Sequence, residues 1–136
     1  MKNRFMAKSN LCPCGSKLEF SDCCYPFING QSLPATPEQL MRSRYSAYTL
    51  ADIDYIIETM SGAAAEGYDR EEALEWARSI KWLKLEVIKS AMIDSQSGTV
   101  EFNAYYRFQN KKHLLHEVSL FKLIDNRWFY VAQLPD

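Results

Sequence analysis

Residues 12–24 read Cys-Pro-Cys-Gly-Ser-Lys-Leu-Glu-Phe-Ser-Asp-Cys-Cys, and they hold every cysteine of the 136-residue chain. The spacing is C-x-C-x8-C-C, and a Gly-Ser pair follows the first two cysteines. A turn can close there, because proline fixes its own φ and glycine tolerates a positive φ. The eight intervening residues then bring the second pair of cysteines back to the first. Four thiols gathered in this way indicate a single tetrahedral metal site.

We expect Cys12, Cys14, Cys23 and Cys24 to bind one Zn²⁺, which accepts four thiolates in a closed shell. A catalytic zinc needs an open position for water, so four protein ligands predict a structural ion. Thirteen residues cannot bury a core unaided, and the metal would therefore hold this segment in shape.

Two details of the local backbone follow from this hypothesis. Adjacent residues usually point apart, so both cysteines of the second pair can bind one ion only where the chain bends, as at a helix start. Ser21 or Asp22 would cap such a helix. The backbone N–H groups of Gly15 and Ser16 would point at the thiolates and offset their charge.

Other uses of four cysteines remain alternatives. Disulfide or redox chemistry is typical of small secreted domains, but no signal peptide opens the chain, and we expect a reducing cytoplasmic location. Independent free thiols would have no reason to cluster. An iron–sulfur cluster also uses four cysteines, but its usual spacings differ from this one.

The segment from Cys12 to Cys24 resembles the SEC-C zinc motif, which is also found at the C-terminus of the preprotein translocase motor, where it is similar to a chaperone-docking knuckle. Residues 40–48, Leu-Met-Arg-Ser-Arg-Tyr-Ser-Ala-Tyr, and the pair Asp54-Tyr55 resemble the bacterial YchJ-type proteins. That resemblance implies a SEC-C knuckle over residues 1–30, followed by a domain of the nuclear transport factor 2-like fold over residues 31–136. Many members carry a second knuckle at the C-terminus, which the residues up to Asp136 lack.

Composition favours a small domain with a buried core rather than a disordered chain. Hydrophobic residues make up 47% of the sequence and charged residues 24%. The net charge of −1 argues against nucleic-acid binding by the protein as a whole. The N-terminal arm is mildly basic, with Lys2, Arg4, Lys8 and Lys17. No apolar run is long enough to span a bilayer.

Helices are predicted in the first part of the larger domain. Thr36 as N-cap, Pro37 at the first position and Gln39 completing a capping box begin a helix that runs to about residue 50. Asp52 begins a second helix, in which apolar residues recur from position 53 to position 60 with a helical period. Asp69 begins a third, which ends near residue 79.

The second half of the chain alternates with the period of a strand. Four strands are expected, near residues 83–87, 99–108, 113–123 and 128–134. The short turns between them imply antiparallel neighbours. Helices first and a four-stranded meander afterwards make an α+β fold, which we expect to be a cone-like curved sheet packed on the helices.

The hollow of such a cone would be a second candidate site. The polar or amphipathic residues that could face it are Tyr45, Asp54, Tyr55, Trp82, Tyr105, His116, Glu117 and Trp128. His116 shares its strand parity with Leu114, Val118 and Leu120, so we expect it to point into the core. It would be a general base, a hydrogen-bonded structural histidine or a histidine at a sheet edge.

Arg42 and Arg44 would clamp an anion, or would lie on the surface or pair with Glu38 or Asp54. The sequence contains no nucleophile elbow, phosphate-binding glycine loop or H-E-x-x-H motif, which argues against nucleotide-dependent chemistry. Whether the chain is an enzyme stays open, and a binding role is favoured.

Three hypotheses for function follow. The first is a protein-interaction adaptor, in which Lys8, Lys17, Leu18 and Phe20 of the knuckle dock on a partner. The resemblance implies that this partner belongs to the secretion or protein-quality machinery. The second is a small-molecule receptor or enzyme that uses the cone pocket, and the third is an RNA- or ribosome-associated factor. A homodimer formed through the sheets is also expected from the fold that the resemblance implies.

Overall fold

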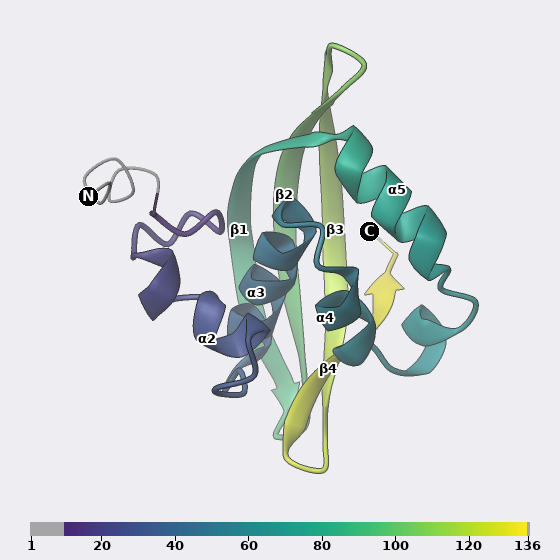
Figure 1. Ribbon diagram of the computed structural model, residues 1–136. Helices are drawn as coiled ribbons and strands as arrows, with labels where there is room; N and C mark the ends of the chain where they lie inside the picture. The colour runs from purple at the N-terminus through teal and green to yellow at the C-terminus, as the bar shows by residue number, and fades with distance from the viewer. Residues whose placement is uncertain (1–9, 136) are drawn as a thin grey trace.

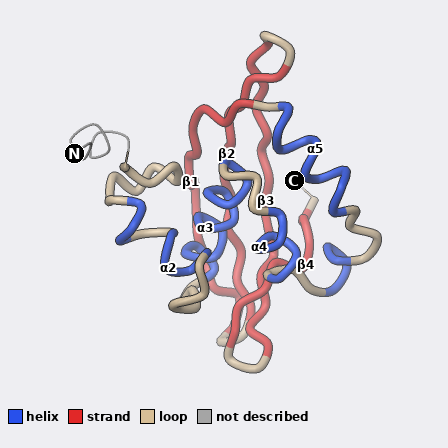
Figure 2. Tube along the Cα trace, in the orientation of Figure 1, coloured by secondary structure: helices blue, strands red, loops and turns tan. Residues whose placement is uncertain are grey.

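The computed structural model describes residues 10–135, in which short helices precede a four-stranded sheet (Figure 1). Figure 2 shows the same division, with every strand following the last helix. The helical elements are the 3₁₀ turn η1 (Phe20–Asp22), α2 (Tyr25–Ile28), α3 (Pro37–Thr49), α4 (Ile53–Glu58), the 3₁₀ turn η2 (Gly62–Ala65) and α5 (Arg70–Ser79). The strands are β1 (Lys81–Asp94), β2 (Ser97–Phe108), β3 (Lys111–Ile124) and β4 (Arg127–Leu134).

The strands form an antiparallel meander in the order β1-β2-β3-β4, as the short turns predicted. The β2–β3 turn consists of Gln109 and Asn110, and the β3–β4 turn of Asp125 and Asn126, all with positive φ. Two-residue hairpins with left-handed residues match the twist of the strands that they join, and Asn and Asp tolerate this conformation. The α+β class expected from the sequence is confirmed.

Strand β1 is longer than the expected residues 83–87. Its pairing with β2 shifts register at three places, the first between Trp82 and Lys84 and the second between Val87 and Lys89. Each shift interrupts the alternation of buried and exposed residues, which explains why the sequence pattern did not reveal the full strand. Bulges also increase local twist, and β1 bends where it leaves α5 (Figure 1).

Three predicted helix starts are confirmed, since the side chains of Thr36, Asp52 and Asp69 accept hydrogen bonds from backbone N–H groups three residues later. The capping box differs in one detail, because Gln39 Oε1 accepts from the Ala35 N–H at 2.7 Å and not from that of Thr36. Helix α4 ends at Glu58, so Met60 lies outside it and forms an isolated bridge with Tyr130.

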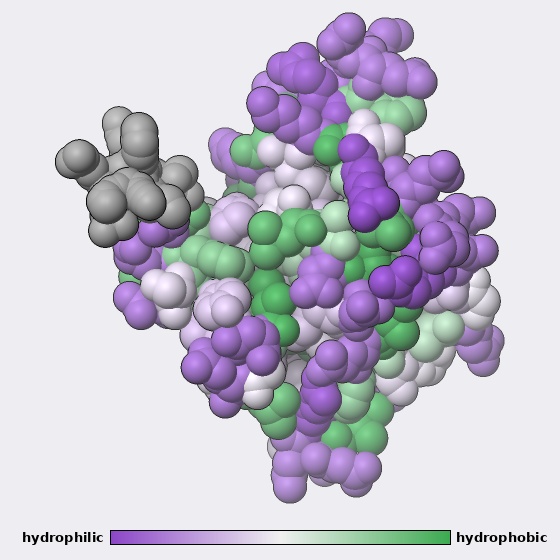
Figure 3. Space-filling model, viewed as in Figure 1, coloured by the Kyte–Doolittle hydropathy of each residue, from purple (hydrophilic) through white to green (hydrophobic). Residues whose placement is uncertain are grey.

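Helices α3 and α4 lie over one face of the sheet, and α5 packs beside α4 (Figure 1). Residues from α3 and from the inner face of the sheet form the larger hydrophobic cluster, in which Leu40, Val100 and Phe121 are fully buried. A second cluster joins α4 and α5 around Ile53 and Ile56. Hydrophilic residues cover α5 and the two ends of the molecule, while apolar residues lie nearer the middle of the face in Figure 3.

The residues of β3 that face the helices are those that the sequence pattern had placed on the outside. Directly opposed residues of an antiparallel pair share a face, and Glu117 opposes the buried Phe102 of β2, while Ser119 opposes the buried Val100. The inner face is therefore made by the odd-numbered residues, and Leu114 and His116 point to the outer face. The predicted inward orientation of His116 was wrong. Leu114 and Val118, which share its parity, are apolar although they lie on the outer face.

We expect Thr36→Ala to lower the free energy of unfolding by about 1 kcal/mol, because the Gln39 N–H, 3.1 Å from Thr36 Oγ1, loses its acceptor at the start of α3. Urea denaturation followed by circular dichroism measures the change. Thr36→Ser retains the hydroxyl acceptor and serves as the control. A serine variant destabilised as much as the alanine variant would contradict a capping role.

Candidate metal centre

The cysteines lie on a short hairpin followed by two helical turns. Leu11 and Glu19 form an antiparallel bridge, and the Cys12 N–H donates to the Leu18 carbonyl at 2.8 Å. Gly15 closes the turn with a φ of 83°, as the sequence predicted, and its N–H donates to the Cys12 carbonyl. Cys23 is the C-cap residue of η1 and Cys24 is the N-cap residue of α2, so the cysteine pair lies directly before a helix start.

The capping expectation for this region was wrong in its detail. Neither Ser21 nor Asp22 caps α2, since both lie inside η1, and Cys24 occupies the N-cap position without a side-chain hydrogen bond. The 3₁₀ turn η1 and the helix α2 follow each other closely, and together they provide the bend that the cysteine pair requires.

The four cysteine Sγ atoms all lie within 4.8 Å of one another. The Sγ atoms of Cys14 and Cys23 are 3.7 Å apart, and those of Cys23 and Cys24 are 3.9 Å apart. A tetrahedral ion with metal–sulfur bonds of roughly 2.3 Å has sulfur–sulfur edges of roughly 3.8 Å. All four thiols are free, and the disulfide alternative does not describe this structure. The donor set therefore fits one tetrahedral metal ion.

Without a cation, the cluster cannot hold four negative charges. Hydrogen bonds from Cys12 and Cys24 lower the pKa of Cys14. Burial raises the pKa of Cys23 to about 11, and hydrogen bonds with Cys12 and Cys14, together with burial, raise the pKa of Cys24. A metal ion supplies the positive charge that allows the remaining thiols to lose their protons. The backbone N–H of Ser16 also bonds the Cys14 thiolate, as expected, whereas that of Gly15 does not.

The cysteines pack directly against helix α3. Cys12, Cys14 and Cys24 are buried in the same hydrophobic cluster as residues of α3 and β1. Arg42 of α3 donates from Nη1 to the Cys14 carbonyl at 2.8 Å and from Nε to Glu38 at 2.9 Å. The cysteine cluster is thus part of the domain core, and Arg42 connects it to the helix.

The residues expected to dock a partner have different positions. Lys17 and Leu18 are exposed, and 54% of the Leu18 surface is accessible. Phe20 is partly buried and packs on the core cluster, so it does not belong to the exposed surface. Lys8 lies outside the described residues.

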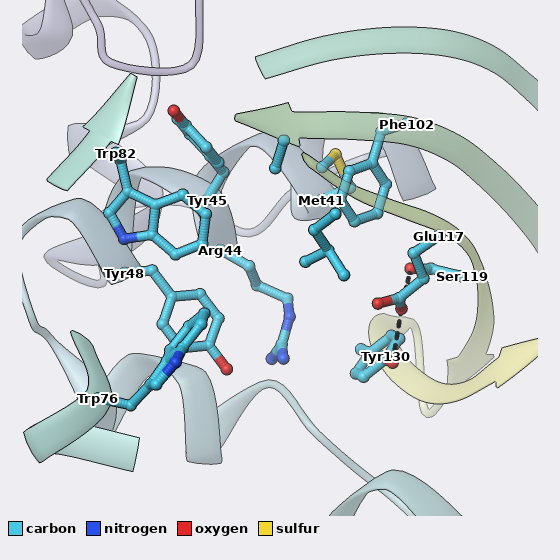
Figure 4. Close-up of a pocket in the computed structure, with 12 residues that line it drawn as sticks. Met41, Arg44, Tyr45, Tyr48, Trp76, Trp82, Phe102, Glu117, Ser119 and Tyr130 are labelled. Carbon is cyan, nitrogen blue, oxygen red and sulfur yellow. Dashed lines mark hydrogen bonds between the residues drawn. The ribbon is translucent and has the colours of Figure 1, made fainter. Parts of the chain in front are cut away.

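A pocket of about 160 Å³ opens between α3, α5 and the inner face of the sheet (Figure 4). Its walls are Met41, Arg44, Tyr45, Tyr48, Trp76, Trp82, Phe102, Ala104, Leu115, Glu117, Ser119 and Tyr130. Glu117 Oε2 accepts hydrogen bonds from Ser119 Oγ and Tyr130 Oη, each at 2.7 Å. Burial raises the pKa of Tyr45 to about 12, which keeps this wall residue neutral.

Of the eight residues that the sequence suggested for the pocket, the structure places Tyr45, Trp82 and Glu117 in its walls. Asp54 is exposed and pairs with Arg70 at 2.9 Å, an interaction that lowers the pKa of the carboxyl. Tyr105 and His116 lie on the outer face, where they bond Glu86 and Glu101. Trp128 is buried near the start of α3, where its Nε1 donates to the Ala35 carbonyl.

Several wall residues that the sequence did not assign to the pocket lie beside Tyr45 on one face of α3. Positions 41, 44, 45 and 48 recur at i, i+3, i+4 and i+7, so one face of α3 presents Arg44 beside Met41, Tyr45 and Tyr48. This spacing was visible in the sequence. Tyr130 and Trp76 could not be assigned, because their places depend on the packing of β4 and α5.

Two family profiles match the chain, and together they cover both regions described above. The SEC-C motif matches residues 9–26, and the YchJ middle NTF2-like domain matches residues 36–133. The solution structure of a SEC-C motif containing protein from Rhodopseudomonas palustris has a TM-score of 0.84 and 36% identity, covering 92% of this chain and 98% of that one. An NTF2-like protein from Shewanella oneidensis, at 15% identity and a TM-score of 0.53, shares the fold alone.

The chain is therefore an NTF2-like domain preceded by a SEC-C motif, and it belongs to the YchJ-type family of UPF0225 proteins. A UPF0225 protein of Actinobacillus succinogenes is 40% identical over 130 residues, which are 93% of this chain and 84% of the relative. One from Sodalis glossinidius is 45% identical over 123 residues, covering 88% and 80% of the two chains. No helix among residues 10–135 is long and apolar enough to cross a membrane.

We expect Arg42→Met to weaken metal binding by about tenfold, because the Cys14 carbonyl loses the donor that orients its loop. Competition with a chromogenic chelator measures the affinity. Glu38→Gln is the matched control, since it removes the charge beside Arg42 but leaves an acceptor for the guanidinium. Equal affinities for wild type and Arg42→Met would show that this contact does not support the metal centre.

Proposed function

We propose that this protein is a zinc-binding adaptor, in which a structural zinc ion on Cys12, Cys14, Cys23 and Cys24 fixes a hairpin that docks on a partner protein. The observation that carries the proposal is the closed set of four close, buried or half-buried thiols. No position remains for a metal-bound water, so the ion would stabilise structure rather than react. Reduced thiols suit a reducing compartment such as the cytoplasm.

Zinc is the ion that best suits the donor set. Thiolates are soft ligands, and a tetrahedral four-sulfur site favours zinc or iron. We expect one zinc per chain, and thiols that react with a thiol reagent only after chelation. Native mass spectrometry and elemental analysis of protein purified without added metal provide the test. Iron in the site, or two oxidised cysteine pairs, would contradict the zinc assignment.

The surface of the cysteine hairpin supports an interaction role. Leu11 and Leu18 are exposed on it, and Tyr25 is exposed on the following helix. Lys17 is the only basic residue among residues 10–28, against Glu19 and Asp22. An apolar surface with little positive charge favours a protein partner over RNA, whose binding needs a basic face. The likeness to a chaperone-docking knuckle suggests a partner in the secretion or protein-quality machinery.

We expect Leu18→Asp to abolish partner binding without changing the metal content or the melting temperature, because this side chain is exposed. Affinity capture from lysate, with bound proteins quantified by mass spectrometry, compares it with wild type. Leu33→Asp is the matched control, since Leu33 is 53% exposed but lies outside the SEC-C motif. Proteins retained equally by Leu18→Asp and wild type would refute docking through the hairpin.

A further inference from the structure

Arg44 is a buried cation for which residues 10–135 provide no anionic partner. Only 7% of its surface is accessible, and its Nη1 donates to the Ile56 carbonyl at 2.8 Å and to Thr59 Oγ1 at 2.7 Å. Among residues 10–135, the guanidinium forms no further hydrogen bond and no ion pair. Burial lowers the pKa of the guanidinium, but arginine keeps its charge in proteins. Buried charges are normally paired, but the Glu117 carboxylate of the same pocket binds Ser119 and Tyr130 and makes no ion pair with Arg44.

The guanidinium extends into the pocket between Tyr48 and Tyr130 (Figure 4). Its Cζ lies 4.7 Å from the centroid of the Tyr130 ring. Both of its hydrogen bonds use Nη1, so Nε and Nη2 have no acceptor among the described residues. A more open hollow, lined in part by Ala63 and Tyr68, shares Arg44, Tyr48 and Tyr130 with the pocket. The Arg44 end of the pocket can therefore be reached from the surface.

Aromatic rings make the wall beside Arg44. The Trp76 and Trp82 rings are 5.6 Å apart in an edge-to-face arrangement, and Tyr45 and Tyr48 also pack on Trp82. Rings prefer such offset or edge-to-face neighbours. A cavity of roughly 150 Å³ holds a benzene ring, so the 160 Å³ here suits a ligand with one ring.

Two further polar groups line the pocket. Trp82 Nε1–H is buried and has no hydrogen-bond partner among residues 10–135, although a buried donor normally has one. Glu117 binds Ser119 and Tyr130 through Oε2. The pocket thus offers the unbonded guanidinium nitrogens of Arg44 as donors, and the Glu117 carboxylate as an acceptor.

We propose that this pocket binds a small aromatic carboxylate, whose carboxylate pairs with Arg44 and whose ring packs among Tyr48, Trp76 and Trp82. The negative charge would neutralise the buried guanidinium through charge-assisted hydrogen bonds. Glu117 would favour ligands that carry a hydroxyl or amino group away from the carboxylate. This binding site is separate from the metal centre and from the docking hairpin.

Nuclear magnetic resonance of the ¹⁵N-labelled, metal-loaded full chain tests the proposal through its indole N–H signals. Benzoate, phenylacetate and 4-hydroxybenzoate are titrated through the low-millimolar range. We expect the Trp82 indole signal to move on addition of an aromatic carboxylate. The Trp128 indole signal should stay in place, since that N–H already donates to the Ala35 carbonyl outside the pocket.

The neutral isostere 4-hydroxybenzamide separates recognition of charge from filling of space. We expect it to bind about tenfold more weakly than 4-hydroxybenzoate, because it cannot pair with the guanidinium. The proposal is overturned if no carboxylate moves the Trp82 signal, or if the amide binds as tightly as the acid. Neither result depends on the partner-docking proposal, since the hairpin residues are unchanged.

Discussion

The contact between the four cysteine sulfurs and helix α3 is the constraint on which the N-terminal part of the structure depends. The hairpin and the two short turns contain too few apolar residues to fold alone, and they gain stability from a shared core. Cys12 Sγ lies 3.5 Å from Ser46 Oγ, and the Cys14 carbonyl accepts from Arg42. A metal ion that joins the four sulfurs would fix the hairpin on the domain as well as fix its own fold.

Helix α3 links this centre to the pocket. Arg42 and Arg44 are two residues apart and therefore point in directions about 200° apart around the helix. Arg42 reaches the cysteine loop, while Arg44 enters the pocket and contacts Tyr130 of β4. The fully buried Ser43 and Ser46 lie on the same helix, which leaves little freedom for it to move independently of its neighbours. The same element therefore positions a metal centre on one side and a candidate ligand site on the other.

Local features of the sequence determined most of what could be predicted. The cysteine spacing predicted that four sulfurs lie together, and the capping residues Thr36, Asp52 and Asp69 identified three helix starts. The pocket was harder to predict, because its wall residues come from α3, α5 and all four strands. His116 shows the difficulty: Leu114 and Val118 have its parity, yet they lie on the outer face, and the polar Glu117 and Ser119 point inward.

Hydrogen bonds inside the pocket explain why polar residues of β3 point inward. Glu117 is tolerated on the inner face because Ser119 and Tyr130 donate to its carboxylate. Tyr130 lies on the neighbouring strand β4, and a cross-strand partner of this kind is set by register, which is not visible in a single strand. Arg44 was recognised as an anion clamp candidate, but its burial depended on the position of β4, which only the assembled sheet defines.

Amide hydrogen exchange measured with the metal bound and after chelation tests most directly whether the metal centre belongs to the domain core. We expect chelation to remove protection from residues 10–28 and also from α3 and β1, because these elements share one buried cluster with the cysteines. Loss of protection confined to residues 10–28, with α3 and β1 unchanged, would show instead that the hairpin is an independent appendage.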